Sequence, residues 1–157
     1  MSPSTTIRPA RADEVDAIAD ATAGQPLLAR YGSDRASLAR ALAGALDRGE
    51  PVLVAVDDSG APLGFAWFLT RGTLSLGGYL RLIALAPGAE GRGVGARLLD
   101  EVERATSADS RHLFLLVSGF NDGARRFYAR RGYREAGTLP SLVKEGIDEI
   151  LMWKRLR

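Results

Sequence analysis

The sequence of 157 residues contains no cysteine. This absence excludes disulfide bonds, thiolate metal sites and a covalent thioester intermediate on the protein. His112 is the single histidine, so a metal site built from several histidines is also excluded. A serine triad would depend on this one residue, with no GxSxG turn to support it. Any acyl transfer must therefore be direct, or use oxygen or nitrogen groups.

Long apolar runs are missing as well. No purely apolar run exceeds five residues, as at Leu113–Val117, which is far too short to span a bilayer. The first residues, MSPSTTIRPARADE, lack the apolar segment of a secretory signal. We therefore expect a soluble cytoplasmic protein with no membrane partner.

Lysine is scarce: Lys144 and Lys154 are the only two, and arginine supplies the other cations. Acidic residues offset them, leaving a net charge of +2, so bulk charge does not indicate a polyanion partner. The segment RRFYARRGYR, residues 125–134, interleaves aromatic and basic residues and suggests a nucleic-acid binder. It is one short helix in a weakly charged chain, so this interpretation ranks low and we expect no nucleic-acid partner.

The residues present suit one globular domain over residues 1–157, without repeats or linkers. Asp13 is positioned to cap a first helix with an apolar face, and Ser33 a second, with the breaker Gly24–Pro26 between them. The segment 111–117 contains the unbroken apolar run Leu113–Val117, which favours a strand buried on both faces. The predicted strands are 5–8, 52–56, 63–69, 79–85, 111–117, 133–139 and 147–154, and the later helices are 93–106 and 121–131. The order is βααβββαβαββ, a mixed α/β (α+β) sheet with one parallel crossover.

Three glycines, Gly91, Gly93 and Gly95, alternate in EGRGVGA, residues 90–96, between a strand and a helix. Such a turn points free backbone N–H groups and the positive end of a helix dipole at an anion, and a diphosphate is a suitable ligand. Arg92 or Arg97 could add positive charge. The spacing fits neither the GxGxxG of dinucleotide folds nor a Walker loop. The alternative is a flexible turn that contains glycine.

This loop resembles the motif of the GNAT superfamily of N-acetyltransferases, Gln/Arg-x-x-Gly-x-Gly/Ala at a helix start, which binds the diphosphate of acetyl-CoA. Gly93 and Gly95 match, whereas Glu90 replaces the usual Gln or Arg. We assume that Glu90 points outward and that Arg92 helps. The family's next segment is similar to LLVSGFNDGARRFYARRGY, and its matching residues are Asn121, Ala124, Phe127, Tyr128, Gly132 and Tyr133.

The resemblance implies that the strands 79–85 and 111–117 diverge and open a cleft for the pantetheine arm of acetyl-CoA. Main-chain groups of Ile83–Leu85 would pair with the arm, and one N–H there would polarise the thioester carbonyl. Asn121 either binds the arm or caps its helix. The predicted cofactor-binding residues are Ile83, Ala84, Leu85, Gly91, Arg92, Gly93, Val94, Gly95, Ala96, Asn121 and Tyr128. No metal site is expected.

Tyr128 is the predicted general acid that protonates the departing CoA thiolate. Ala124, Phe127 and Tyr128 share one helix face, which supports an inward orientation. The alternative is a half-buried aromatic with a solvated hydroxyl.

Deprotonating an alkylammonium at pH 7 costs about 4–5 kcal/mol, so the reaction needs a general base. The predicted strand YLRLIAL, residues 79–85, carries no carboxylate, so the base must come from another segment. Candidates are Glu145, Asp148, Glu149 and His112. Strand alternation gives Glu149 the least solvated position, so it is the first choice.

The resemblance thus implies an acyltransferase that moves an acetyl group from acetyl-CoA to a primary amine of a small molecule or peptide in a ternary complex. A homodimer is compatible with this function. The alternative is a non-catalytic module that binds acyl-CoA. Aromatic Trp67 and Phe68 are expected to fill the core rather than to line the acceptor site.

Overall fold

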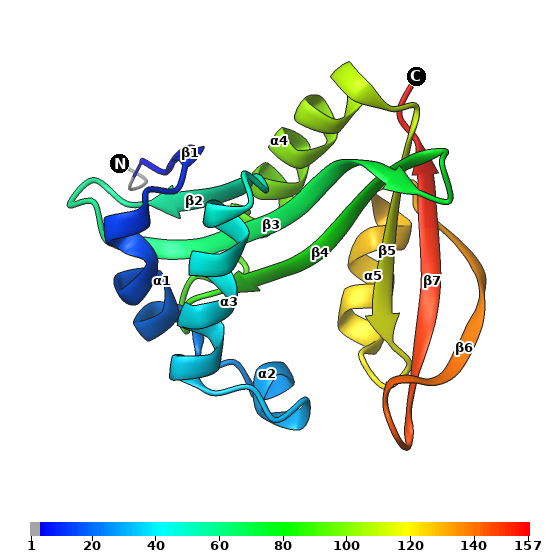
Figure 1. The fold of residues 1–157 in the computed structure, drawn as a ribbon, viewed down its shortest axis with the longest axis horizontal. Helices are drawn as coiled ribbons and strands as arrows, with labels where there is room; N and C mark the ends of the chain where they lie inside the picture. The colour runs from blue at the N-terminus through cyan, green and yellow to red at the C-terminus, as the bar shows by residue number, and fades with distance from the viewer. Residues whose placement is uncertain (1–3) are drawn as a thin grey trace. The chain divides into compact units, whose positions relative to one another are not determined.

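The computed structural model describes residues 4–157, in which the strands form one seven-stranded sheet. The strands are β1 (Thr6–Pro9), β2 (Val52–Val56), β3 (Pro62–Thr73), β4 (Gly77–Leu85), β5 (His112–Ser118), β6 (Arg134–Lys144) and β7 (Ile147–Arg155). The helices are α1 (Val15–Thr22), α2 (Pro26–Arg30), α3 (Arg35–Asp47), α4 (Val94–Asp109) and α5 (Asp122–Arg130), and a 3-10 turn η1 (Ala12–Glu14) precedes α1. Across the sheet the order is β1-β2-β3-β4-β5-β7-β6 (Figure 1). The prediction of a mixed α/β sheet is confirmed.

Contacts divide the described residues into two compact units. Unit 1 holds residues 4–68 and Leu82–Val102, and unit 2 holds Leu69–Arg81 and Glu103–Arg157. The elements β3, β4 and α4 contribute residues to both. The expectation of one domain over residues 1–157 stays a prediction.

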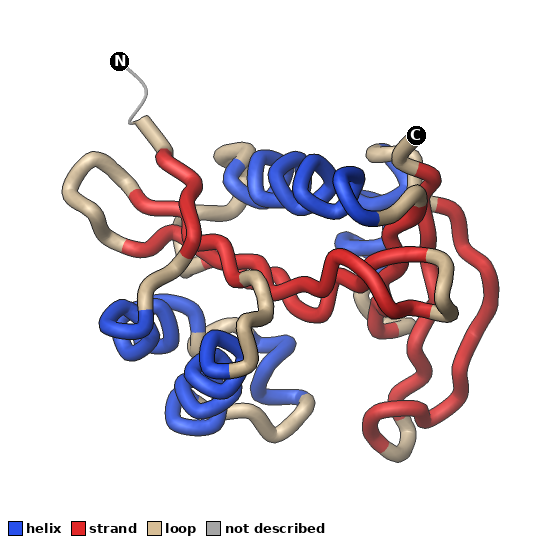
Figure 2. Tube along the Cα trace, turned by 45° about the horizontal axis from the view of Figure 1, so that its top comes forward, coloured by secondary structure: helices blue, strands red, loops and turns tan. Residues whose placement is uncertain are grey.

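Unit 1 is built on a core between helices and strands. Helices α1 and α3 lie side by side on one face of β2 and β3 (Figure 1), and α4 lies on the other side of these strands (Figure 2). The buried residues of α1 are the four that the apolar spacing predicts: Val15, Ile18, Ala19 and Thr22. Trp67 and Phe68 are buried as well, which confirms that they fill the core. Burial of each large side chain contributes about 1.5–3 kcal/mol.

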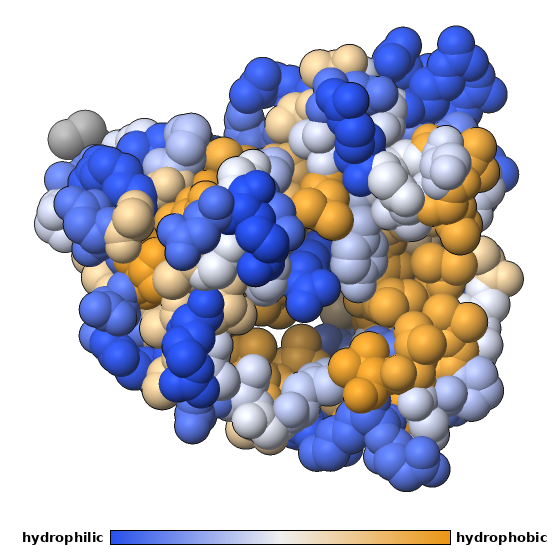
Figure 3. Space-filling model, viewed as in Figure 1, coloured by the Kyte–Doolittle hydropathy of each residue, from blue (hydrophilic) through white to orange (hydrophobic). Residues whose placement is uncertain are grey.

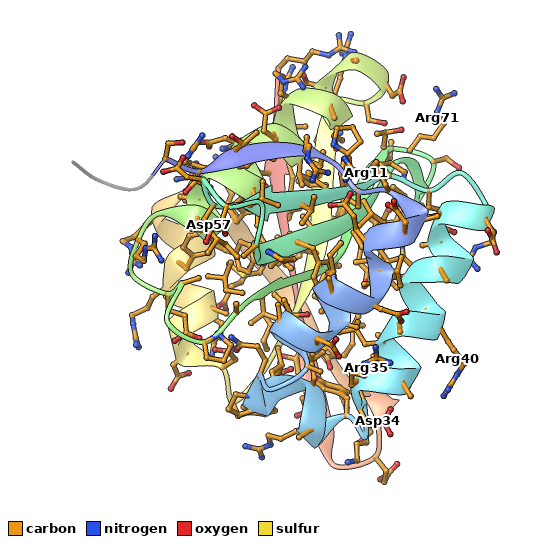
Figure 4. All side chains as sticks on the ribbon, turned by 90° about the vertical axis from the view of Figure 1, so that its left-hand side faces the viewer. Arg11, Asp34, Arg35, Arg40, Asp57 and Arg71 are labelled. Carbon is orange, nitrogen blue, oxygen red and sulfur yellow. The ribbon has the colours of Figure 1, made fainter. Side chains whose placement is uncertain are left out.

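The predicted caps of the first two helices are wrong by one residue. Asp34, not Ser33, is the N-cap of α3 (Figure 4). Its carboxylate accepts from Ser37 N–H at 2.8 Å, and Ser37 Oγ accepts from Asp34 N–H at 2.9 Å. Asp13 lies within η1, and Glu14 occupies the position before α1. The Glu14 carboxylate binds Arg8 and Arg11 N–H instead of capping α1. The cap of α3 therefore depends on the reciprocal pair Asp34–Ser37, and the Glu14 carboxylate is already used by Arg8 and Arg11.

The breaker between the first two predicted helices contains an unpredicted short helix, α2. Pro26 takes its first position, where the fixed φ of proline suits a helix and the missing N–H costs no hydrogen bond. The interpretation of Pro26 as a helix breaker is therefore wrong, because Pro26 is the first residue of α2.

Unit 2 holds a parallel pairing of limited length. Pairs between β4 and β5 run from Gly77–His112 to Leu80–Leu115, although β4 continues to Leu85. The pairing confirms that these strands are parallel. Antiparallel β7 borders β5, and β6 forms a hairpin with β7.

The two faces of β5 differ in their surroundings. Leu113, Leu115 and Val117 are buried, and α5 lies behind β5 in Figure 1. The opposite face is also apolar: Leu116 of β5 lies opposite Leu151 of β7, and both are only half-buried. Figure 3 shows apolar atoms gathered over β5 and β7. Residue 149 of β7 belongs to this second face.

Within residues 4–157, no helix has both the length and the apolar character that crossing a bilayer requires. The same part of the chain contains no group of three or more His, Cys, Asp or Glu side chains placed to hold a metal ion.

Candidate functional site

The glycine loop of unit 1 adopts a conformation that explains two of its glycines. Gly91 and Gly93 have φ values of +72° and +78°, in the left-handed region that other residues adopt at a cost of about 1–2 kcal/mol. A Cβ at either position would meet nothing within 4 Å. These glycines are therefore required for the turn itself, and they leave open space beside it. Gly95 is the second residue of α4.

Helix α4 begins directly after this turn, and the first N–H groups of a helix have no acceptor within the helix itself. Arg97 N–H donates to Gly93 O at 3.1 Å, so the N–H groups of Val94, Gly95 and Ala96 precede the first complete turn. Val94 and Leu98 are buried and fix the start of the helix in unit 1. Free N–H groups and the positive end of the helix dipole make this turn suited to an anion.

Charged side chains surround the loop in unequal ways. Arg92 is exposed. Hydrogen bonds from Ser59 and Ala61 lower the pKa of Asp57, in the turn after β2 (Figure 4), and the positive charge of Arg92 lowers it further. The Glu90 carboxylate accepts from Gln25 Nε2 at 3.0 Å. The acid in the unusual motif position therefore has a partner from the segment before α2.

The end of β4 presents its main-chain groups to two different edges. Ala86 N–H donates to Leu63 O of β3 at 2.9 Å, and the Ala84 carbonyl lies against Gly64 of β3. Peptide groups of successive strand residues point to opposite edges, so those of Ile83 and Leu85 point away from β3. Of the three residues predicted to bind the pantetheine arm, Ala84 therefore points its carbonyl at β3, and only Ile83 and Leu85 point their peptide groups away from β3.

Two tyrosines of unit 2 stand next to each other and differ in their hydroxyl partners. The Tyr128 and Tyr133 rings meet edge to face, with centroids 5.5 Å apart. Tyr133 Oη donates to Glu103 Oε1 at 2.9 Å, and Lys154 Nζ binds the same carboxylate at 3.0 Å. The Tyr128 hydroxyl has no hydrogen-bond partner within residues 4–157. The proton of Tyr128 is thus not committed to a protein acceptor.

Burial affects the chemistry of both phenols. Burial raises the pKa of Tyr128, and this side chain is 6% exposed. Burial and the Glu103 carboxylate raise the pKa of Tyr133. Both side chains therefore stay protonated at neutral pH. Within residues 4–157, Tyr128 is thus a protonated phenol whose O–H donates to no other group.

Asn121 performs the capping role that was one of its two predicted alternatives. It stands before α5, and its Oδ1 accepts from Ala124 N–H at 3.1 Å. Its side-chain NH2 donors are separate from this cap. Arm binding by Asn121 stays a prediction.

Among the candidate bases, Glu149 is the most buried. Its exposed fraction is 3%, whereas Glu145 and Asp148 are exposed and His112 is half-buried. Glu149 stands opposite Ser118 of β5. Burial raises the pKa of Tyr79 on β4, Arg81 lowers it, and Glu149 raises it again, so the charge of Glu149 acts near this phenol. The expectation that Glu149 is the least solvated of the four is correct.

Two features of the site were not predicted from the sequence. Gln25 Nε2 donates to Leu85 O as well as to Glu90, across separations of 60 and 65 residues. The Tyr133–Glu103–Lys154 cluster joins α4 to residues beyond α5. No local pattern marks these contacts, because the partners are a backbone carbonyl and ordinary polar side chains that lie far apart in the sequence.

The sequence model described as the acetyltransferase (GNAT) family matches residues 17–133. An uncharacterized N-acetyltransferase of Methanocaldococcus jannaschii is 36% identical over 80 residues, which are 50% of this chain and 51% of that protein. The chain thus spans about half the length of this relative.

Solved structures share the fold. A GNAT phosphinothricin acetyltransferase of Sinorhizobium meliloti, in complex with AcCoA, aligns with a TM-score of 0.76 and 23% identity over 99% of this chain and 89% of that one. A GNAT acetyltransferase of Bacillus cereus aligns with a TM-score of 0.77 and 20% identity over 97% of each chain. The family match covers both the glycine loop and Tyr128. This chain belongs to the GNAT family of acetyltransferases.

Proposed function

We propose that this acyltransferase moves an acetyl group from acetyl-CoA to a primary amine by direct attack in a ternary complex. The observation that carries the proposal is the turn before α4, in which Gly91 and Gly93 hold left-handed backbone beside unpaired N–H groups. The absence of cysteine removes a thioester intermediate on a thiol of the protein. The amine nitrogen then attacks the thioester carbonyl itself.

The proposed ligand contacts are mostly main-chain. The N–H groups of Gly93 to Ala96 bind the diphosphate, and Arg92 adds a positive charge. Peptide groups at Ile83 and Leu85, which point away from β3, pair with the pantetheine arm, and an N–H there polarises the thioester carbonyl. Side-chain identity matters little for these contacts.

Tyr128 is the proposed acid. Its pKa is above that of a typical thiol, near 8.5, so donation to the thiolate is uphill in water. Desolvation raises the pKa of a thiol as it raises that of a phenol, so a thiolate buried beside Tyr128 offsets the effect of burial on the tyrosine. Tyr133 is less suited, because its hydroxyl already donates a hydrogen bond to Glu103.

Glu149 is the proposed base for the attacking amine. It is buried on the apolar face of unit 2, opposite Ser118 of β5. The proton passes from the ammonium to the carboxylate, directly or through one water, before the nitrogen attacks.

The test is release of free thiol from acetyl-CoA in the presence of a panel of amines: small aliphatic amines, amino acids and peptides with free N-termini. The expected result is amine-dependent release with one acetylated product per thiol, seen by mass spectrometry. Binding of CoA without thiol release for any amine would contradict the proposal in favour of a binding module. Absence of CoA binding by calorimetry would contradict the assignment of the loop.

A further inference from the structure

The carbonyl of Leu85 is an edge acceptor of β4. It points away from β3, because the neighbouring Ala84 and Ala86 use their peptide groups toward that strand. The pairing of β4 with β5 ends at Leu80. An edge carbonyl of this kind accepts an N–H from any extended segment beside it, as in strand addition.

A side chain of the same unit already occupies this acceptor. Gln25 Nε2 donates to Leu85 O at 2.5 Å and to Glu90 Oε1 at 3.0 Å. A glutamine NH2 has two hydrogens, so these two contacts use both. Gln25 precedes α2, but it makes no side-chain cap to that helix. Its amide is committed to the β4 edge and the glycine loop.

The chain around Gln25 supports this placement. Gly24 lies near Pro87, since a Cβ there would be 3.9 Å from Pro87 Cγ. Gln25 N–H donates to Thr22 O at 3.2 Å, which ties the segment to the end of α1. The Gln25 side chain therefore extends from an anchored backbone onto the strand edge.

We infer that the Gln25 amide is an intramolecular competitor for the pantetheine arm, and that Glu90 holds it on the Leu85 carbonyl. The inference rests on the proposed function, in which an amide N–H of the arm pairs with this edge of β4. A primary amide and a secondary amide offer the same N–H donor, so one replaces the other at the same acceptor. Binding of the arm then releases Gln25 from β4.

This role also gives Glu90 a reason to be acidic. The carboxylate accepts from Gln25, and a hydrogen bond to a charged acceptor is stronger than one to a neutral amide. A glutamine at position 90 would accept a weaker hydrogen bond from Gln25 Nε2, and an arginine would accept none. The departure of Glu90 from the family motif is thus a consequence of its contact with residue 25.

The test compares two ligands by calorimetry: CoA, which carries the arm, and ADP, which carries a diphosphate without it. Gln25→Ala is expected to lower the Kd for CoA by about threefold to tenfold, which corresponds to one hydrogen bond. The Kd for ADP is expected to change by less than about twofold. Gln25→Met keeps the bulk without the donors and is expected to give the same gain. The ratio of the two affinities isolates the arm.

Glu90→Ala removes the hold on Gln25 and a negative charge together. The loss of charge affects the binding of both ligands. The ratio of CoA affinity to ADP affinity is therefore expected to rise only by the contribution of the hydrogen bond between Glu90 and Gln25. In the double variant with Gln25→Ala, the second change is expected to add nothing to that ratio. Additive effects on the ratio would overturn the role given to Glu90.

Hydrogen exchange supplies a second readout. CoA is expected to increase amide exchange at residues 24–31 of the wild type, and to leave the already faster exchange of Gln25→Ala unchanged. Unchanged or weaker CoA binding by Gln25→Ala, with wild-type binding intact, would overturn this inference alone. A wild type that binds neither CoA nor ADP would overturn the proposed function and this inference with it.

Discussion

The glycine loop of unit 1 and the tyrosine pair of unit 2 differ in the kind of group that we propose for ligand contact: main chain in the loop, a side chain in the pair. In the loop the donors are backbone N–H groups at the start of α4, and the side chains of Glu90 and Arg92 are exposed. In unit 2 the proposed group is one buried hydroxyl, that of Tyr128. Main-chain binding tolerates side-chain changes but needs the left-handed turn, whereas side-chain chemistry depends on one atom and its surroundings.

The largest expected effect is a loss of CoA affinity when the glycine loop is changed. Gly93→Glu places a carboxylate where a diphosphate is proposed to bind, in a turn with φ of +78°. Repulsion between unit charges about 4 Å apart, at an effective dielectric constant of about 20, is about 4 kcal/mol, or about a thousandfold in affinity. Calorimetric titration with CoA measures the loss.

Gly49→Glu is the matched control for Gly93→Glu. Gly49 has φ of +72°, follows α3, and a Cβ there would meet nothing within 4 Å. It imposes the same strain without the charge in the loop, so CoA affinity is expected to stay within about twofold. Retained affinity in Gly93→Glu would show that the loop does not bind the diphosphate.

The second prediction addresses the side-chain half. Tyr128→Phe is expected to lower kcat by about a hundredfold, the usual contribution of a general acid, with little change in the Kd for CoA. Steady-state kinetics and calorimetry on the same preparation separate the two.

Tyr133→Phe is the control for Tyr128→Phe. It removes the hydrogen bond to Glu103, so the free energy of unfolding is expected to fall by about 1–3 kcal/mol while kcat stays within a few-fold. Equal losses of kcat in the two variants would assign both tyrosines a structural role.

Glu149→Gln is expected to have a smaller effect, about tenfold to a hundredfold on kcat/KM at pH 7. The deficit is expected to shrink as pH approaches the pKa of the amine, about 10.4, because free amine then needs no base. Asp148→Asn, the exposed neighbour on β7, is the control and is expected to retain its activity. A deficit independent of pH would exclude Glu149 as the base.

The smallest expected effect concerns stability in unit 1. Hydrogen bonding from Arg8 lowers the pKa of Glu14 from 4.5 to about 2, against the opposing effect of burial. The folded pKa lies below the unfolded one, so the pair stabilises the fold above pH 4.5 and loses this contribution as pH falls toward 2.

Glu14→Gln is therefore expected to lower the free energy of unfolding by about 1–2 kcal/mol at pH 7, after allowance for solvent screening, and by almost nothing near pH 2. Denaturant titration at both pH values measures this. Asp13→Asn, at an exposed neighbour, is expected to show no such dependence. A loss of equal size at both pH values would show that packing, not charge, explains the effect of Glu14.

Local patterns carried much of the fold. The apolar spacing of α1 predicted its four buried residues, and the apolar run in β5 predicted a strand, of which one face is buried and the other only partly so. The cap of α3 and the start of α2 were wrong, because Asp34 and Ser33 offer equivalent side chains and Pro26 suits both a stop and a start. Choices between neighbouring residues depend on contacts that a local pattern does not contain.

The sequence by itself determined the glycine spacing and the Asn-Ala-Phe-Tyr order that indicated the family, because both are short-range features of one turn and one helix face. Only the tertiary structure decided that the Tyr133 hydroxyl donates a hydrogen bond to Glu103, and that the Gln25 side chain donates to Leu85 O and Glu90. Those contacts join residues 30 to 65 positions apart, and a hydrogen bond over such a separation forms only when the fold brings donor and acceptor within about 3 Å.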